Sequence, residues 1–181
     1  MNLTLVRHCE VEEKYIGCYN GHIDIGLSKY GYKQAKELAH KLKNENYDAV
    51  FCSDLKRAKE SLKYFTNLKN LIYTDKLREK YWGEDEGKTY DEICKNKDIT
   101  YENFEQWIDT LDGEDMEDFT LRVEEFFYKY LKNLKYKNVL ILTHGGVIST
   151  FFSIYNKISL EESFSNKINY SSIKKLHYEH N

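Results

Sequence analysis

The chain has 181 residues, of which 41% are hydrophobic and 31% are charged, and its formal net charge is −3. This length fits one domain with a sizeable core, and the mild charge gives no electrostatic reason to expect nucleic acid or an anionic membrane as a partner. The N-terminus becomes charged too early for a secretion signal, and no apolar run approaches the length of a membrane span. The four cysteines lack C-x-x-C spacing, which suits reduced thiols. We therefore expect a cytoplasmic protein.

Apolar runs and helical spacing predict nine elements. In chain order these are a strand over 2–7, a helix that begins at Ser28, a strand over 48–52, a helix over 55–65, a strand over 71–73, a helix over 115–134, a strand over 138–143, a helix from 145 to about 155, and a strand over 173–178. Strands that alternate with helices indicate an α/β fold, a three-layer αβα sandwich around a mostly parallel sheet.

Charged or reactive side chains follow three of the predicted strands. They are the pair Arg7 and His8, the stretch 53–57 that ends in Arg57, and the stretch 143–145 that contains His144. Ligands of parallel α/β sheets bind outside the carboxyl ends of the strands. These three clusters therefore predict a site at that edge.

The residue types in these clusters suit the transfer of a phosphoryl group. A phosphomonoester carries about two negative charges, which cations and N–H donors must hold. Arg7 and Arg57 offer planar guanidinium forks for phosphate oxygens, and His144 can donate to them. A neutral imidazole attacks phosphorus, so His8 can be the nucleophile.

The leaving oxygen also needs a proton, and an acidic stretch at 77–87 can supply it. Glu79 is the favoured acid, with Glu84 and Glu86 as alternatives that the sequence leaves open. A cysteine-phosphatase interpretation is disfavoured, because Cys52 and Arg57 are one residue too close for a C-x5-R loop and no glycine lies between them.

Five motifs in the expected order resemble the histidine phosphatase superfamily, also called phosphoglycerate-mutase-like, over nearly the whole chain. The motifs are LVRHCE, GHIDIGLSKYGYKQAKELA, CSDLKRAKES, LREKYWGEDEG and LTHGGVI. The short length and the stretch GEDMEDFTLRV look most like the alpha-ribazole phosphatase branch. The resemblance implies that His8 becomes a phosphohistidine, that Arg7, Arg57 and His144 bind the phosphoryl group, and that Glu79 protonates the leaving oxygen and later activates water.

The resemblance also suggests further contacts and contains departures. Asn20 and Gly21 stand where the family's loop adds phosphate contacts, and Gly145 opens a helix where a glycine suits close approach of an anion. Lys14 stands where an asparagine is usual, and it is either a substitute point charge or a solvated lysine. Cys9 replaces the family's glycine after the nucleophile, which would strain the backbone if φ were positive.

The leading hypothesis is a metal-independent phosphomonoesterase that needs no cofactor and acts on a small phosphorylated metabolite, possibly alpha-ribazole 5′-phosphate. The alternatives are a phosphoglycerate-type mutase and a catalytically impaired phospho-ligand-binding member. We expect a single domain over 1–181, as a monomer or homodimer, with a lid-like segment at about 80–121. Residues 88–121 hold eleven acidic residues, three lysines and no arginine, which disfavours a doubly anionic mutase substrate. His177 and His180 have H-x-x-H spacing without further ligands, so no metal site is expected.

Overall fold

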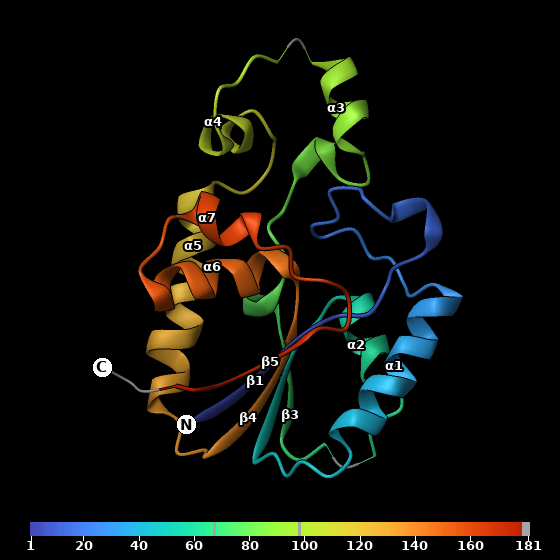
Figure 1. Ribbon diagram of the computed structural model, residues 1–181, viewed down its shortest axis with the longest axis vertical. Coiled ribbons are helices and arrows are strands. Elements are labelled where there is room, and N and C mark those ends of the chain that lie inside the picture. The colour runs from blue at the N-terminus through green and yellow to red at the C-terminus, as the bar shows by residue number, and fades with distance from the viewer. Residues whose placement is uncertain (67, 98, 179–181) are drawn as a thin grey trace.

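Five strands form the central sheet in the order β3-β2-β4-β1-β5 (Figure 1). The computed structural model describes residues 1–66, 68–97 and 99–178. The strands are β1 (Asn2–Arg7), β2 (Ala49–Ser53), β3 (Leu71–Thr74), β4 (Asn138–Thr143) and β5 (Ile173–His177). β1 pairs in parallel with β4, β4 with β2, and β2 with β3, whereas β5 runs antiparallel to β1 at one edge. The mostly parallel sheet is confirmed.

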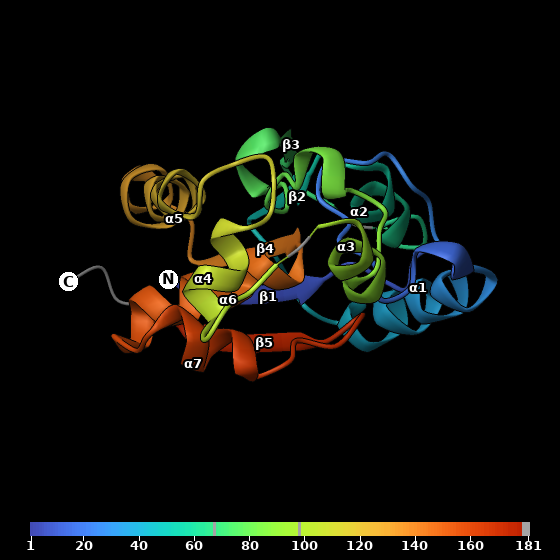
Figure 2. The ribbon, with the colours of Figure 1, turned by 90° about the horizontal axis from the view of Figure 1, so that it is seen from above.

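Helices cover both faces of this sheet (Figure 2). One face packs against α1 (Lys29–Leu42) and α2 (Lys56–Ser61), and the other against α5 (Met116–Glu124) and α6 (Gly145–Asn156). Successive strand residues divide between the two cores: Leu140 and Leu142 face the first, and Val139 and Ile141 the second. This alternation is why the buried strands are apolar throughout, and it confirms the αβα sandwich.

The segment between β3 and α5 forms a smaller unit that stands apart from the sheet (Figure 1). It contains α3 (Tyr90–Asn96), α4 (Phe104–Asp109) and the 3-10 turn Gly83–Asp85. Its own apolar cluster is built from Trp82, Ile93, Trp107, Ile108 and Leu111. Tyr19 packs against this cluster, and the Trp107 Nε1–H donates to its hydroxyl at 2.8 Å.

Several helix boundaries differ from the predicted ones. α2 ends at Ser61, and the helix predicted over 115–134 consists of α5, a π-helical turn (Glu125–Tyr130) and a 3-10 turn (Leu131–Asn133). α3, α4 and α7 (Leu160–Ser165) were not predicted, and 3-10 turns also occur at Glu13–Tyr15 and Asp75–Leu77. No helix within 1–66, 68–97 and 99–178 is long and apolar enough to cross a membrane.

Candidate active site

The five predicted catalytic residues come together at the carboxyl ends of β1, β2 and β4. Arg7 ends β1 and His8 follows it, while His144 follows β4 at the start of α6. The ring centroids of His8 and His144 are 5.0 Å apart. Arg57 comes from α2 and Glu79 from the chain after β3, and both interact electrostatically with this group of residues. The catalytic cluster, as we call these five residues, therefore draws on β1 and the residue after it, α2, the N-cap of α6 and the chain after β3.

His8 is buried and held in one orientation. Its Nδ1 lies 2.7 Å from the carbonyl oxygen of Cys9, which can only accept, so Nδ1 carries the proton of the neutral ring and Nε2 has the free lone pair. Burial, followed by the charges of Arg57 and Arg7, lowers the pKa of His8 well below its ordinary value. His8 is therefore a neutral imidazole at physiological pH.

Arg57 is fully buried, and no carboxylate of residues 1–66, 68–97 and 99–178 forms an ion pair with its guanidinium. Its Nη1 donates to the carbonyl oxygen of Ile23, and its Nη2 to those of Asn20 and Gly21 at 2.9 and 2.6 Å. Burial lowers the pKa of Arg57 to about 10, which leaves it charged near pH 7. A buried cation held only by carbonyl dipoles is costly unless an anion completes its surroundings.

Arg7 is held by the loop before β5. Its Nη1 donates to the carbonyl oxygen of Ile168 at 2.5 Å, and its Cζ lies 4.1 Å from the ring centroid of Tyr170. The Tyr170 ring is also 5.5 Å from that of His8. Sequence reasoning missed Tyr170, because its position depends on the antiparallel return of β5.

His144 is buried and contacts β2. Its Nε2 lies 2.8 Å from the Ser53 hydroxyl, which leaves Nδ1 for another partner. Burial, and then the charge of Arg57, lowers the pKa of His144 well below its usual value. Ser53 was predicted only as the first residue of a cluster, and the structure gives it this orienting contact.

Glu79 lies against the start of α6, and its two competitors do not. The amide of Gly146 donates to Glu79 Oε2 at 2.9 Å, while the ring of His22 contacts the Glu79 carbonyl oxygen at 3.1 Å. Glu86 instead accepts from the backbone amides of His22 and Trp82. Glu84 is exposed on the turn Gly83–Asp85. The geometry therefore favours Glu79 among the three acids.

Of the four predicted binding residues, three contact the arginines of the catalytic cluster and one does not. Asn20 and Gly21 present their carbonyl oxygens to Arg57, and Gly145 lies beside Arg7, whose Cζ would be 3.5 Å from a Cβ there. Lys14 is exposed, and its ammonium lies over the Tyr15 ring at 4.6 Å. Among the described contacts, none joins Lys14 to the catalytic cluster.

Cys9 and two further arginines define the surroundings of the catalytic cluster. Cys9 does not have a positive φ, so its replacement of glycine causes no backbone strain, and its side chain packs in the core beneath α1 and α2. Arg78 and Arg122 form double hydrogen bonds with Asp54 and Glu114 respectively. Arg122 also donates to the carbonyl oxygens of Arg78 and Glu79, and so it supports the chain that carries the acid.

Four buried polar atoms of this site have no hydrogen-bond partner in the part of the chain that the structure describes. They are Arg7 Nε, Arg57 Nε, His144 Nδ1 and Asn20 Oδ1. Unsatisfied buried donors cost free energy and are rare in folded proteins. Two of these atoms belong to charged guanidinium groups and a third to the imidazole beside His8, which is the arrangement expected of a site that binds an anion.

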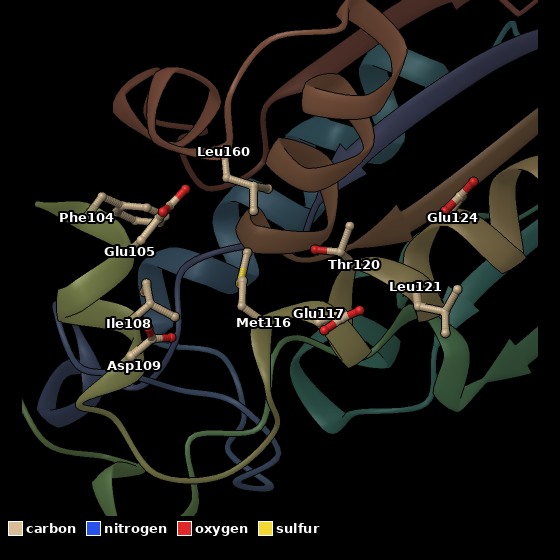
Figure 3. A pocket seen from close by; sticks show the side chains of 10 residues that line it. All are labelled: Phe104, Glu105, Ile108, Asp109, Met116, Glu117, Thr120, Leu121, Glu124 and Leu160. Carbon is tan, nitrogen blue, oxygen red and sulfur yellow. The ribbon is translucent and has the colours of Figure 1, made fainter.

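Two cavities flank the smaller unit. One, of about 500 Å³, is lined by Arg7 and Tyr170 and so adjoins the catalytic cluster. The other is a groove of about 460 Å³ between α4, α5 and Leu160 (Figure 3). Apolar side chains such as Ile108 and Leu121 line this groove together with acidic ones, and none of the predicted site residues is among them.

Comparison with known proteins identifies the family. The sequence model of the histidine phosphatase superfamily (branch 1) matches residues 3–181. The adenosylcobalamin/alpha-ribazole phosphatase of Salmonella typhimurium is 32% identical over 160 residues, which cover 82% of this chain and 76% of that protein. The putative phosphoserine phosphatase 2 of Hydrogenobacter thermophilus is 28% identical over 186 residues, which cover 98% and 89%.

A solved structure agrees with this match. The crystal structure of a putative alpha-ribazole-5′-P phosphatase from Escherichia coli superposes with a TM-score of 0.83 at 25% identity. The superposition covers 99% of this chain and 91% of that one. Similarity therefore extends through the sheet, its helices and the smaller unit.

Proposed function

The chain belongs to the histidine phosphatase superfamily and is a phosphatase, and from this premise we propose that it is a metal-independent phosphomonoesterase that acts through a phosphohistidine at His8. The observation that carries the proposal is the set of unpaired donors on Arg7, Arg57 and His144 around a neutral histidine. A phosphoryl group would satisfy these donors. It would also neutralise the charges of the two guanidinium groups, of which that of Arg57 is fully buried.

The geometry supports a two-step reaction. His8 Nε2 attacks phosphorus, so that an N–P bond forms while the bond from phosphorus to the leaving oxygen breaks. Glu79, in its protonated form, gives its proton to that oxygen and becomes a carboxylate. The carboxylate then takes a proton from water as the water attacks phosphorus, the N–P bond breaks, and inorganic phosphate is released with His8 neutral again.

His144 and the two arginines stabilise the negative charge of the phosphoryl group in different ways. When Ser53 donates its hydroxyl hydrogen to His144 Nε2, the proton of neutral His144 lies on Nδ1, the unpaired atom. His144 then donates to a phosphoryl oxygen without adding charge. Arg7 and Arg57 supply the charge, and their fixed carbonyl contacts keep them in place before substrate arrives.

The substrate belongs to the small phosphorylated metabolites, with alpha-ribazole 5′-phosphate as the candidate suggested by the relatives. Asn20, Gly21 and Gly145 complete the phosphoryl pocket in this proposal, and the 80–121 segment serves as the lid over it. Lys14 would join them only through movement of its exposed side chain.

The test is hydrolysis of an aryl phosphate in the presence of a chelator, with native protein and with His8→Ala. We expect turnover by the native protein and none by the variant, together with an acid-labile, base-stable phosphoryl label on native protein that is quenched in base. Turnover by His8→Ala, or a label that survives acid and is lost in base, would place the phosphoryl group on another residue. Folding of the variant is checked by its circular dichroism.

A further inference from the structure

Arg122, which is not a member of the catalytic cluster, holds the main chain on both sides of the acid. Its Nη1 donates to the carbonyl oxygens of Lys76 and Arg78 at 3.1 and 2.9 Å, and its Nη2 donates to that of Glu79 at 3.4 Å. Its Cζ also lies 5.0 Å from the ring centroid of Phe119 on the same helix, α5. Because the acceptors are main-chain atoms, these contacts fix the path of the chain that carries Glu79.

The same guanidinium forms an ion pair with Glu114. Nε and Nη2 of Arg122 donate to Glu114 Oε1 and Oε2 at 2.9 and 2.8 Å. Together with the three carbonyl contacts, these bonds use all five N–H groups of the guanidinium. Burial alone would raise the pKa of Glu114, but the hydrogen bonds and charge of Arg122 outweigh it and lower this pKa, so the carboxylate is charged near pH 7. The ion pair therefore fixes the orientation of the guanidinium.

Glu114 lies where the chain returns from the smaller unit to the main fold. The chain enters the smaller unit near Tyr81, whose amide donates to Glu114 Oε2 at 3.3 Å and whose carbonyl oxygen accepts from the Glu114 amide at 3.0 Å. Gly113 has a φ of +99°, and a Cβ there would lie 2.4 Å from the Tyr81 carbonyl oxygen. The two crossings of the chain are thus packed together, and Arg122 joins them to the residues around the acid.

We propose that Arg122 and Glu114 are positioning residues for the general acid, and that their ion pair holds the main chain of Glu79 where its carboxyl group reaches the leaving oxygen. The inference rests on the proposed phosphatase function, and it gives a role to both residues of the stretch GEDMEDFTLRV. The Glu79 carboxylate is held separately by the Gly146 amide at 2.9 Å. Both holds matter because small misplacements of a catalytic group are costly.

Arg78 offers the matched control. It adjoins Glu79 in the chain and also binds a carboxylate through two hydrogen bonds, from Nε and Nη2 to Asp54 at 2.7 and 2.6 Å. Among the described contacts, its guanidinium donates to no main-chain carbonyl oxygen. Replacement of Arg78 therefore removes an ion pair of the same kind and leaves in place the carbonyl contacts that hold the chain of the acid.

The experiment compares kcat/KM for beta-glycerophosphate, an alkyl ester, and para-nitrophenyl phosphate, an aryl ester, in native protein and three variants. The aryl leaving group needs little protonation, so its hydrolysis reports nucleophilic attack without the acid. We expect Arg122→Gln to lower the value for the alkyl ester by about tenfold or more, and that for the aryl ester by less than about threefold. Arg122→Lys keeps the charge but not the fork, so its loss should be smaller. Arg78→Gln should change the ratio of the two values by less than about twofold.

A double-mutant cycle with Glu79→Gln gives a readout that a purely structural role would not move. If Arg122 acts through the acid, adding Arg122→Gln to Glu79→Gln should lower kcat/KM for the alkyl ester by no more than about twofold further. A loss that multiplies with that of Glu79→Gln would overturn the positioning role. Thermal melts check folding, and Arg122→Lys replaces Arg122→Gln in the cycle if the glutamine variant is unfolded.

The outcomes separate this inference from the proposed function. Absence of para-nitrophenyl phosphate hydrolysis by native protein would overturn the proposed function itself. Hydrolysis in which Arg122→Gln lowers kcat/KM equally for both esters would overturn only the positioning role, and so would the same alkyl-specific loss in Arg78→Gln. Equal losses on both esters in Glu79→Gln would contradict both, because the ion pair would then have no acid to position.

Discussion

The ring of His8 shows how a single residue is prepared for its chemistry by its neighbours. The carbonyl oxygen of Cys9 fixes the protonated nitrogen, and burial beside Arg57 and Arg7 keeps the ring neutral. A protonated imidazole has no lone pair for attack, so the two arginines that bind phosphate in the proposed mechanism also keep His8 in the form that can attack. Substitution of either arginine should therefore affect both binding and the protonation of His8.

Glu79→Gln should reduce kcat for an alkyl phosphate by about 100-fold or more, the scale for loss of a general acid. Glutamine keeps the contact with the Gly146 amide but has no proton to give. The loss should be much smaller for an aryl phosphate, whose leaving group needs little protonation. Equal losses on both substrates would contradict the assignment, and Glu86→Gln is the matched comparison.

Cys9→Gly should keep activity on an aryl phosphate while lowering the free energy of unfolding by about 1–2 kcal/mol, through a small core cavity and added backbone freedom. Burial raises the pKa of the Cys9 thiol to about 11, so the thiol stays protonated and slow to alkylate at pH 7.5. Urea denaturation and mass spectrometry of alkylated native protein measure these effects. Loss of turnover with His8 intact would reveal a function of the thiol.

At the scale of elements, the N-terminus of α6 holds the Glu79 carboxylate in place through a hydrogen bond. Gly146 donates to Glu79, and a Cβ at Gly146 would lie 2.2 Å from Glu79 Oε1. A side chain cannot occupy that space unless the carboxylate moves. Steric contact with Glu79 thus explains why the second position of the GG pair in LTHGGVI is a glycine, which the sequence alone did not show.

Gly146→Ala should therefore lower kcat/KM for an alkyl phosphate by about tenfold or more, because small misplacements of a catalytic group are costly. Alanine favours helices over glycine, so the melting temperature should be unchanged or higher. Steady-state kinetics with a thermal melt measures both. Full activity with an unchanged melting temperature would show that the carboxylate is free to relocate.

Local signals in the sequence identified some elements but not all of them, and contacts set by distant pairing were not predictable. Ser28 caps α1 as its sequence indicates, since its side chain accepts from the Gly31 amide. α3 was missed although Thr89 and Glu92 form a capping box that the sequence displays. The position of Tyr170 against Arg7 had no local signal, because it requires β5 to pair antiparallel with β1.

For the whole molecule, the family motifs predicted that His8, Arg7, Arg57 and His144 share one site, and the fold brings them together because each lies at or after the carboxyl end of a strand. The ion pairs of the 80–121 segment could not be predicted from the sequence. The eleven acids of residues 88–121 suggested only that this segment repels anionic substrates. The structure shows that two lysines of this stretch, Lys88 and Lys97, pair with the buried Asp85 just before it.

The stability of the whole molecule should fall as pH drops below about 6.5. His8 and His144 have pKa values far below those of the unfolded chain, so the unfolded state binds more protons in this range and gains from acidification. Urea denaturation between pH 7.5 and 5.5 measures the slope. Inorganic phosphate should flatten it, and so should His144→Gln. If the free energy of unfolding depends on pH equally in native protein and in His144→Gln, then His144 does not have a lowered pKa in the folded state.

The pairing of β1 with β4 and β5 has a consequence for synthesis on the ribosome. Asn2 pairs with Asn138 and with His177, so β1 gains its backbone hydrogen bonds only after β4 and β5 have been synthesised. The Ser171 amide also donates to the His8 carbonyl oxygen, so the main chain of His8 gains this contact only when residue 171 has emerged. A nascent chain that stops before residue 166 thus contains all five residues of the catalytic cluster but lacks the loop and the strand that hold Arg7 and His8, and we expect it to show no hydrolysis.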